Sequence, residues 1–197
     1  MTPRVPPVAF REWPAELTAA LPSVNRPGAS MEEGSQKAKS LLGTLAHHPD
    51  LVRASLPLNA HILRATSLSE RQRELLVLRV AVLRRATYIW VEHTPMARRA
   101  GLDDDEIAGV AFGPEAACWD GVDSALTRSV DELLEDGAIS DRTWSVLAES
   151  LDVRQLIDLI YTVGVYQISA FMVRSFALDP EDLVPNDSPI SSDEVAP

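Results

Sequence analysis

Cysteine is almost absent from this sequence: Cys118 is the only one among 197 residues. A single cysteine cannot form a disulfide bond within the chain, so we expect a reducing compartment, the cytoplasm. The first 30 residues contain six prolines and no hydrophobic block, which argues against a secretory signal. No uninterrupted apolar run reaches the roughly 18 to 20 residues of a membrane-spanning helix, and we therefore expect no membrane partner.

Several motifs of common enzyme classes are also missing. The sequence has no glycine-rich phosphate loop, no G-x-S-x-G nucleophile elbow and no cysteine or histidine pair with zinc spacing. His47 and His48 are adjacent, so they point to different sides of a helix. We therefore expect no metal site.

Positive charge is scarce as well. The formal net charge is -11, and a phosphate backbone is bound largely by lysine and arginine, so nucleic acid is not an expected partner. The charge is uneven, because residues 67–101 hold seven arginines against three glutamates, a net charge of +4. An arginine of this segment could bind a small carboxylate through its planar guanidinium; the alternative is that these arginines lie on solvated helix faces or in ion pairs.

This arginine-rich segment should form the centre of the fold. Ser69 followed by Gln72 has the form of a capping box, and the apolar run Leu75–Leu83 predicts a helix that is buried on most sides. Thr87 is expected to cap a second helix, which ends at Gly101. No stretch alternates as a strand does, so we predict an all-α fold with about seven helices.

Composition divides the chain into three parts. Residues 1–34 are rich in proline and predict an extended arm, residues 35–178 hold the helical domain, and residues 179–197 predict an acidic, disordered tail. The last helix is expected from Val153 to about Phe176. Within it, Gly164 suggests the close approach of another backbone or a ligand. Its buried seam is expected at Leu156, Ile160, Val163, Gln167 and Phe171.

Two titratable residues of the central segment are candidates for acid/base chemistry. Glu74 lies in the buried run, where a carboxylate must be paired, hydrogen-bonded or protonated. His93 on the next helix comes level with Glu74 if the two helices run antiparallel, so the pair could exchange protons with a substrate. Tyr88 could hydrogen-bond a developing enolate; the alternative is aromatic packing.

Four further residues could bind the substrate. Trp90 could form a wall for a flat molecule, and an arginine such as Arg79 or Arg85 could hold a carboxylate. His61, or its neighbour Asn59, could face the same cavity as the acid/base pair. The alternative for His61 is a structural hydrogen bond within a helix contact.

At these residues the sequence resembles the carboxymuconolactone decarboxylase family, which includes the AhpD alkylhydroperoxidase branch. The resemblance covers approximately residues 35–176 and is most specific in LSERQRELLVLRVA and ARRAGLDDDEI. In the peroxidase branch, a glutamate is followed by two cysteines spaced CxxC and then by a histidine. Glu74 and His93 match the outer positions, but Ala86 and Ile89 occupy the cysteine positions. Thiol peroxidase activity is therefore not expected, since both sulfur atoms are missing.

The resemblance implies an AhpD-like helical bundle that assembles as a homo-oligomer, a trimer or a hexamer. It also implies a lyase, isomerase or hydrolase that needs no cofactor and acts on a small lactone or carboxylic acid. The alternative is a non-catalytic helical oligomer that binds a small ligand or a protein partner. A closed pocket containing Glu74 and His93 would favour the enzyme, whereas an open surface with both residues in salt bridges would favour the binding protein.

Overall fold

The computed structural model describes residues 2–15, 17, 18 and 41–178. Within these ranges the chain forms eight α-helices and no strand, which confirms the all-α class with one helix more than expected. The predicted tail and most of the predicted arm lie outside the described residues. The helices are α3 (Leu41–Leu45), α4 (Pro49–Ala60), α5 (Glu70–Leu83), α6 (Thr87–Arg99), α7 (Asp104–Phe112), α8 (Gly121–Glu135), α9 (Asp141–Ser150) and α10 (Val153–Ser175).

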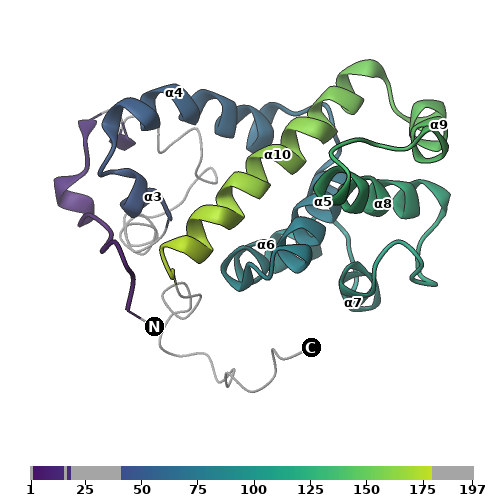
Figure 1. The fold of residues 1–197 in the computed structure, drawn as a ribbon, viewed down its shortest axis with the longest axis horizontal. Helices are drawn as coiled ribbons and strands as arrows, with labels where there is room; N and C mark the ends of the chain where they lie inside the picture. Colours follow the sequence, from purple (N-terminus) through teal and green to yellow (C-terminus); the bar gives the residue numbers. More distant parts are fainter. Residues whose placement is uncertain (1, 16, 19–40, 179–197) are drawn as a thin grey trace.

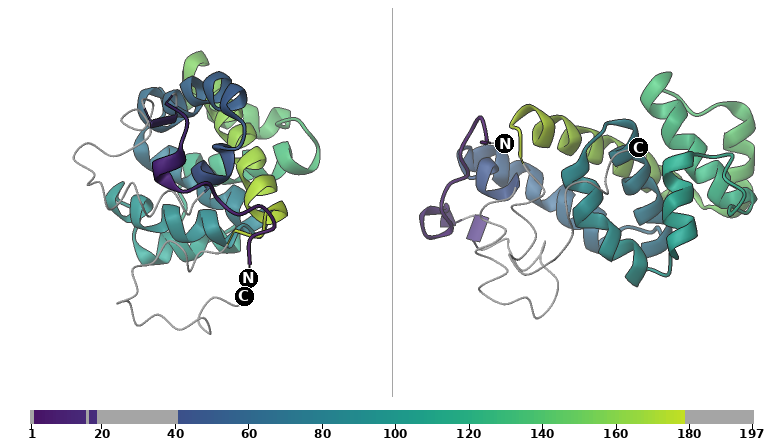
Figure 2. Two further views of the ribbon diagram at one scale, coloured as in Figure 1. Left: turned by 90° about the vertical axis from the view of Figure 1, so that its left-hand side faces the viewer. Right: turned by 90° about the horizontal axis from the view of Figure 1, so that it is seen from below.

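The helices form two groups joined by α10. Figure 1 shows α3 and α4 on one side of the molecule and α7, α8 and α9 on the other, with α10 running between them. The right-hand view in Figure 2 shows the same separation. Helix α5 packs against α6, α8 and α10 and is therefore the centre of the larger core.

Helix α5 begins and is buried as its sequence predicts. The capping box between Ser69 and Gln72 is present, and every residue from Glu74 to Ala81 is buried. Two charged side chains, Glu74 and Arg79, lie within this buried run. Because a buried charge must be paired, each of these side chains determines what packs next to α5.

Arg79 connects α5 to α7 and α8. Its guanidinium forms two hydrogen bonds with the carboxylate of Asp131, at 2.7 and 2.8 Å, and donates to the carbonyl oxygen of Val110 at 2.9 Å. A Cβ atom at Gly113 would lie 3.0 Å from the Arg79 guanidinium, and the backbone φ there is +117°. The end of α7 therefore requires glycine for its conformation and for the space that Arg79 occupies.

Asp158 joins α10 to the segment that precedes α5. Its Oδ1 lies 2.9 Å from Nε2 of His61, and its Oδ2 accepts hydrogen bonds from the backbone N–H and the hydroxyl of Ser67 at 2.6 and 2.7 Å. Thr66 donates a further hydrogen bond. Burial alone would raise the pKa of Asp158, but these hydrogen bonds outweigh burial and lower the pKa from 3.8 to about 2.

The described part of the N-terminal segment packs on α3 and α4. Trp13 and Leu17 are buried in a second, smaller hydrophobic cluster that also contains Ala46, Val52 and Leu56. The backbone N–H of Arg4 donates to the carbonyl oxygen of Phe176, just after α10, at 2.8 Å. This segment therefore contacts the first helices of the domain, α3 and α4, and also the end of α10. Figure 2 shows it passing over the side of the molecule that α3 and α4 form.

Two local expectations were wrong, and a third has no support within the described residues. Thr87 does not cap α6: the cap is Ala86, whose side chain has no hydrogen-bonding group, and Thr87 is the first helical residue. Gly164 is exposed, and no described atom lies within 4 Å of a Cβ placed there, so a backbone or ligand close to it would have to come from outside the described residues. The expected seam of α10 was also wrong, because Ile160 and Phe171 are 42% and 56% exposed. The buried face instead follows Leu156, Leu159, Val163, Tyr166, Ala170 and Val173.

The outer face of α10 is apolar although it has no partner within the described residues. Its exposed side chains are Val153, Ile157, Ile160, Tyr161, Ile168 and Phe171, with Gly164 near the middle. By length and composition alone α10 could cross a membrane, but 44% of its most apolar window is buried inside the structure, and core helices of globular proteins pass the same test. A second copy of the chain is our prediction for the partner of this face.

The predicted oligomer can be tested at the middle of this face. Replacing Ile160 by glutamate would bury a charge in the contact between copies, so we expect the Ile160→Glu protein to have a smaller solution mass than the wild type. Sedimentation equilibrium measures both masses against the 21.5 kDa of one chain. Val146→Glu on α9 is the matched control, since Val146 is exposed to a similar extent. A wild-type protein of one chain would contradict the prediction.

The network around Asp158 predicts a pH-dependent contribution to stability. Asp158→Asn should lower the free energy of unfolding at neutral pH by about 1–3 kcal/mol, because hydrogen bonds to a buried carboxylate are lost. Since folding lowers the pKa of Asp158, its stabilisation is present above pH 3.8 and disappears as the pH falls towards 2. Urea unfolding of both proteins across this range measures the difference, which should shrink on acidification. Asp136→Asn is the control, because Asp136 is exposed; a constant difference would refute the assignment.

Candidate active site

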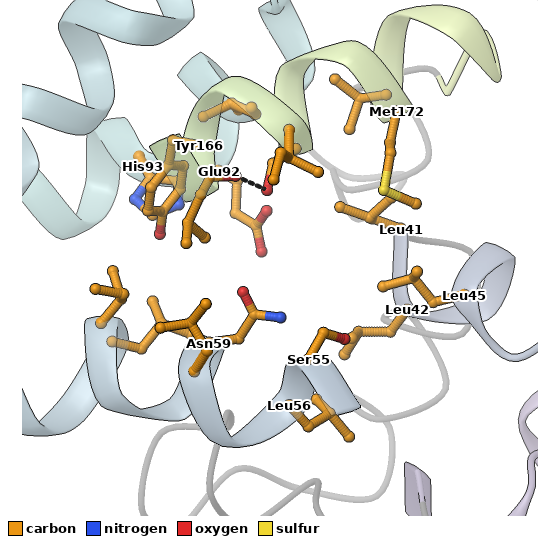
Figure 3. Close-up of a pocket in the computed structure, with 18 of the residues that line it drawn as sticks. Leu41, Leu42, Leu45, Ser55, Leu56, Asn59, Glu92, His93, Tyr166 and Met172 are labelled. Carbon is orange, nitrogen blue, oxygen red and sulfur yellow. Dashed lines mark hydrogen bonds between the residues drawn. The ribbon is translucent and has the colours of Figure 1, made fainter. Parts of the chain in front are cut away.

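A cavity of about 560 Å³ lies between α4, α6 and α10 and is bounded at one end by α3. Figure 3 shows that its two ends differ in chemistry. The side chains at the polar end include Asn59, Glu92, His93 and Tyr166. Those at the other end are mainly aliphatic and include Leu41, Leu42, Leu45 and Met172. Such a volume is within the range of small-molecule sites.

Glu74 and His93 meet at the polar end. Oε2 of Glu74 lies 2.8 Å from Nδ1 of His93, and both side chains are buried. The other oxygen of Glu74 accepts two hydrogen bonds from Arg73, at 2.9 and 3.0 Å. Burial would raise the pKa of Glu74, but the hydrogen bond and charge of His93 and the charge of Arg73 lower it. Glu74 is therefore ionised at neutral pH.

This pairing determines which nitrogen of His93 is available to a ligand. An ionised carboxylate can only accept hydrogen bonds, so the neutral imidazole must carry its proton on Nδ1, facing Glu74. Nε2 then keeps its lone pair. His93 lines the cavity, so this nitrogen is the one that can take a proton from a bound molecule.

Tyr166 of α10 is the aromatic neighbour of His93. The two ring centroids are 5.0 Å apart with an interplanar angle of 88°, and Figure 3 shows the Tyr166 hydroxyl directed into the cavity. Burial, followed by the negative charges of Glu74 and Glu92, raises the pKa of Tyr166 well above 10. The phenol therefore stays protonated and is a hydrogen-bond donor. The sequence alone does not place Tyr166 next to His93, because no local pattern positions α10 beside α6.

Glu92 and Asn59 face the cavity from opposite walls. Figure 3 shows the carboxylate of Glu92 on α6 pointing into the space, with the amide of Asn59 on α4 across from it. Both side chains are partly buried, and neither makes a hydrogen bond to any residue that the structure describes. Of the two residues expected to face the cavity, Asn59 lines it and His61 does not.

Tyr88 lies at the cavity but Trp90 does not. The lining residues of α6 follow one helical face, which includes Tyr88, Glu92 and His93 and leaves Trp90 on another side. Trp90 instead packs against the core. The hydroxyl of Tyr88 accepts a hydrogen bond from the backbone N–H of Leu41 at 3.3 Å, so it already has one partner.

The other three predicted binding residues do not line the cavity. Arg79 is paired with Asp131 at the far side of α5, and Arg85 is exposed in the turn between α5 and α6. His61 belongs to a π-helical turn, η2 (His61–Ala65), and is directed towards Asp158. The arginines that do line the cavity are Arg64, Arg73 and Arg99.

The two positions that hold cysteines in the peroxidase branch are buried and carry no sulfur. Ala86 and Ile89 are 1% and 3% exposed at the start of α6. Cys118 is exposed in the segment between α7 and α8. Among the residues described by the structure, no cluster of histidine, cysteine and acidic side chains could hold a metal ion.

A family comparison agrees with the resemblance noted in the sequence. Residues 49–135 match the model of the carboxymuconolactone decarboxylase family, a range that contains Glu74 and His93 but not Tyr166. No curated protein matches the sequence significantly.

Solved structures give the same fold at low sequence identity. The alkylhydroperoxidase AhpD core of an uncharacterised peroxidase-related protein from Ralstonia eutropha has a TM-score of 0.72 at 18% identity, covering 95% of this chain and 94% of that one. A peroxidase-related protein from Silicibacter has a TM-score of 0.66 at 15% identity, with 91% and 94% covered. A protein of unknown function from Agrobacterium tumefaciens, related by its describers to the antioxidant defence protein AhpD, has a TM-score of 0.61 at 17% identity, with 68% and 93% covered.

Family model, fold and the Glu74–His93 pair agree with one another. Over residues 49–135 the chain is similar to the carboxymuconolactone decarboxylase family, and it has the AhpD-like fold, with Ala86 and Ile89 at the positions of the CxxC pair.

Proposed function

We propose that the protein is an acid/base enzyme of the carboxymuconolactone decarboxylase type that needs no cofactor and acts on a lactone or carboxylic acid. One observation carries the proposal: the ionised, buried Glu74 holds His93 at the polar end of a ligand-sized cavity. A histidine that is oriented by a carboxylate and lines a cavity has the geometry of a general base.

In the proposed reaction, His93 moves a proton at a carbon next to the carbonyl group. Nε2 takes the proton, the C–H electron pair moves into the carbonyl group to form an enolate, and the resulting imidazolium returns the proton at the product carbon. Glu74 stabilises the imidazolium, because the two charges are opposite and 2.8 Å apart. For a decarboxylation, His93 starts as the imidazolium: the electron pair of the broken C–C bond forms the enolate, carbon dioxide leaves, and Nε2–H gives its proton to the enolate carbon.

The enolate needs a hydrogen-bond donor, and Tyr166 is the best placed. Its phenol stays protonated because its pKa is raised, and its hydroxyl is directed into the cavity beside His93. A donor held in place in a dry site stabilises developing negative charge more than water does. We therefore assign to Tyr166, whose ring contacts that of His93, the role expected for Tyr88.

The alternative is a non-catalytic protein in which Glu74 and His93 serve only structure. The observation in its favour is that Glu74 has partners for both oxygens, Arg73 and His93, as a structural buried charge would. The two functions differ in what happens at Nε2 of His93. An enzyme must transfer a proton between Nε2 and the substrate, whereas a binding protein needs only a cavity of the right shape for its ligand.

Turnover in matched variants tests the enzyme. Against a panel of lactones and carboxylic acids in deuterium oxide, loss of C–H signal and formation of product are followed by NMR. His93→Ala should lower the rate by about 10²–10⁴-fold, since a general base is removed. Glu74→Gln should lower it by a smaller factor, and His47→Ala, at an exposed histidine, should leave it unchanged. Full activity in folded His93→Ala and Glu74→Gln proteins would refute the proposal.

The tautomer of His93 provides a test that requires no substrate. Because Glu74 is an ionised acceptor, the neutral ring of His93 should carry its proton on Nδ1. Long-range proton–nitrogen NMR correlations distinguish this tautomer from the Nε2–H form. In Glu74→Gln, where the amide can donate as well as accept, the preference should weaken. Finding the Nε2–H form in the wild type would contradict the orientation on which the mechanism depends.

A further inference from the structure

The cavity extends beyond the acid/base pair, and its far part is lined by aliphatic side chains. From the polar end the space continues along α4 and α10 to α3, where Figure 3 shows Leu41, Leu42, Leu45 and Met172 around it. A small, polar lactone bound at His93 would leave these side chains in contact with water. An aliphatic chain in the same place would release that water, which is favourable.

The polar end excludes one class of ligand and favours another. Glu92 is a carboxylate without an ionic partner among the described residues, next in sequence to His93 and directed into the cavity. Arg73 offers no compensation, because its guanidinium is already bound to Glu74 and to the carbonyl oxygen of Leu63. A ligand carboxylate at this place would therefore be repelled, whereas an N–H or O–H group would find an acceptor.

Asn59 extends the same preference. It faces Glu92 across the cavity, and its amide can both donate and accept. A ligand group that has a hydrogen-bond donor close to an acceptor, as in an amide or a hydroxy ester, matches this pair of side chains. Arg64 and Arg99 also line the cavity, but both are exposed, so water screens their charges.

We propose that the substrate is a neutral, amphipathic carbonyl compound, namely a lactone or ester with an N–H or O–H donor beside its carbonyl group and an aliphatic tail. The carbonyl group lies at His93, the donor binds Glu92 and Asn59, and the tail lies between α4 and α10 towards α3. The position of the carbonyl group rests on the proposed function. The sites for the donor and the tail rest on the cavity alone.

Binding of a graded series of ligands tests the tail site. N-acylated α-amino-γ-butyrolactones with progressively longer acyl chains provide a lactone, an amide N–H and a tail, and calorimetry measures their affinities. Each added methylene should increase affinity by about fourfold until the aliphatic end is full. The ring-opened hydroxy acids, which differ by a carboxylate, should bind at least about tenfold more weakly. Affinity that does not depend on chain length would overturn the proposal.

Two variants locate the contacts. Met172→Trp should fill part of the aliphatic end, so that ligands with long chains lose affinity while those with short chains keep it; Val146→Trp on α9 is the control.

Glu92→Gln should narrow the difference in affinity between the lactones and their ring-opened acids, because the repelling charge is gone. Glu149→Gln, at an exposed residue of α9, should not change it. Equal effects of Met172→Trp and Val146→Trp, or an unchanged difference in Glu92→Gln, would overturn the proposal.

The same measurements separate this inference from the proposed function. Chain-length-dependent binding without turnover of any lactone in the series would overturn the enzymatic function and support the ligand class. If the protein converts short, charged lactones, and if Met172→Trp and Glu92→Gln do not change the rate, the enzymatic function would be supported and the proposed ligand class overturned.

Discussion

The structure depends on one carboxylate in the middle of a buried helix. Glu74 has no exposed surface, and an ionised group in such a place must be paired on every side that water would otherwise occupy. Arg73 and His93 provide the partners, so the position of α6 relative to α5 is fixed by the same contacts that orient the imidazole. The requirement that keeps the fold intact and the requirement that prepares a base are therefore met by one set of atoms.

Local chemistry was sufficient to predict most of the helices. The capping boxes at Ser69 and Asp152 mark the starts of α5 and α10, and the apolar run Leu75–Leu83, which only Arg79 interrupts, indicates a central helix. The errors occurred where a decision depends on distant contacts. An apolar helix such as α10 has several possible seams, and only its packing on α5 decides that Leu159 is buried while Ile160 is exposed.

The candidate site was likewise predictable only in part. Glu74 and His93 followed from a buried carboxylate, an antiparallel helix pair and a family resemblance, and they lie in contact. Tyr166 and Glu92 could not be assigned, because their roles arise from which residues meet around a cavity formed by elements far apart in sequence. Arg79 illustrates the converse: its charge in an apolar run suggested a ligand, but the structure pairs it with Asp131.

The hydrogen bonds of Asp158 have a consequence for the site, which they do not touch. Asp158 and Tyr166 are both on α10, eight residues or about 12 Å apart along its axis. Sliding α10 past α5 would move Tyr166 away from His93, but it would first have to break the contacts of Asp158 with Ser67 and His61. The register between the helix that carries the phenol and the helix that orients the imidazole is thus locked by a group remote from any substrate.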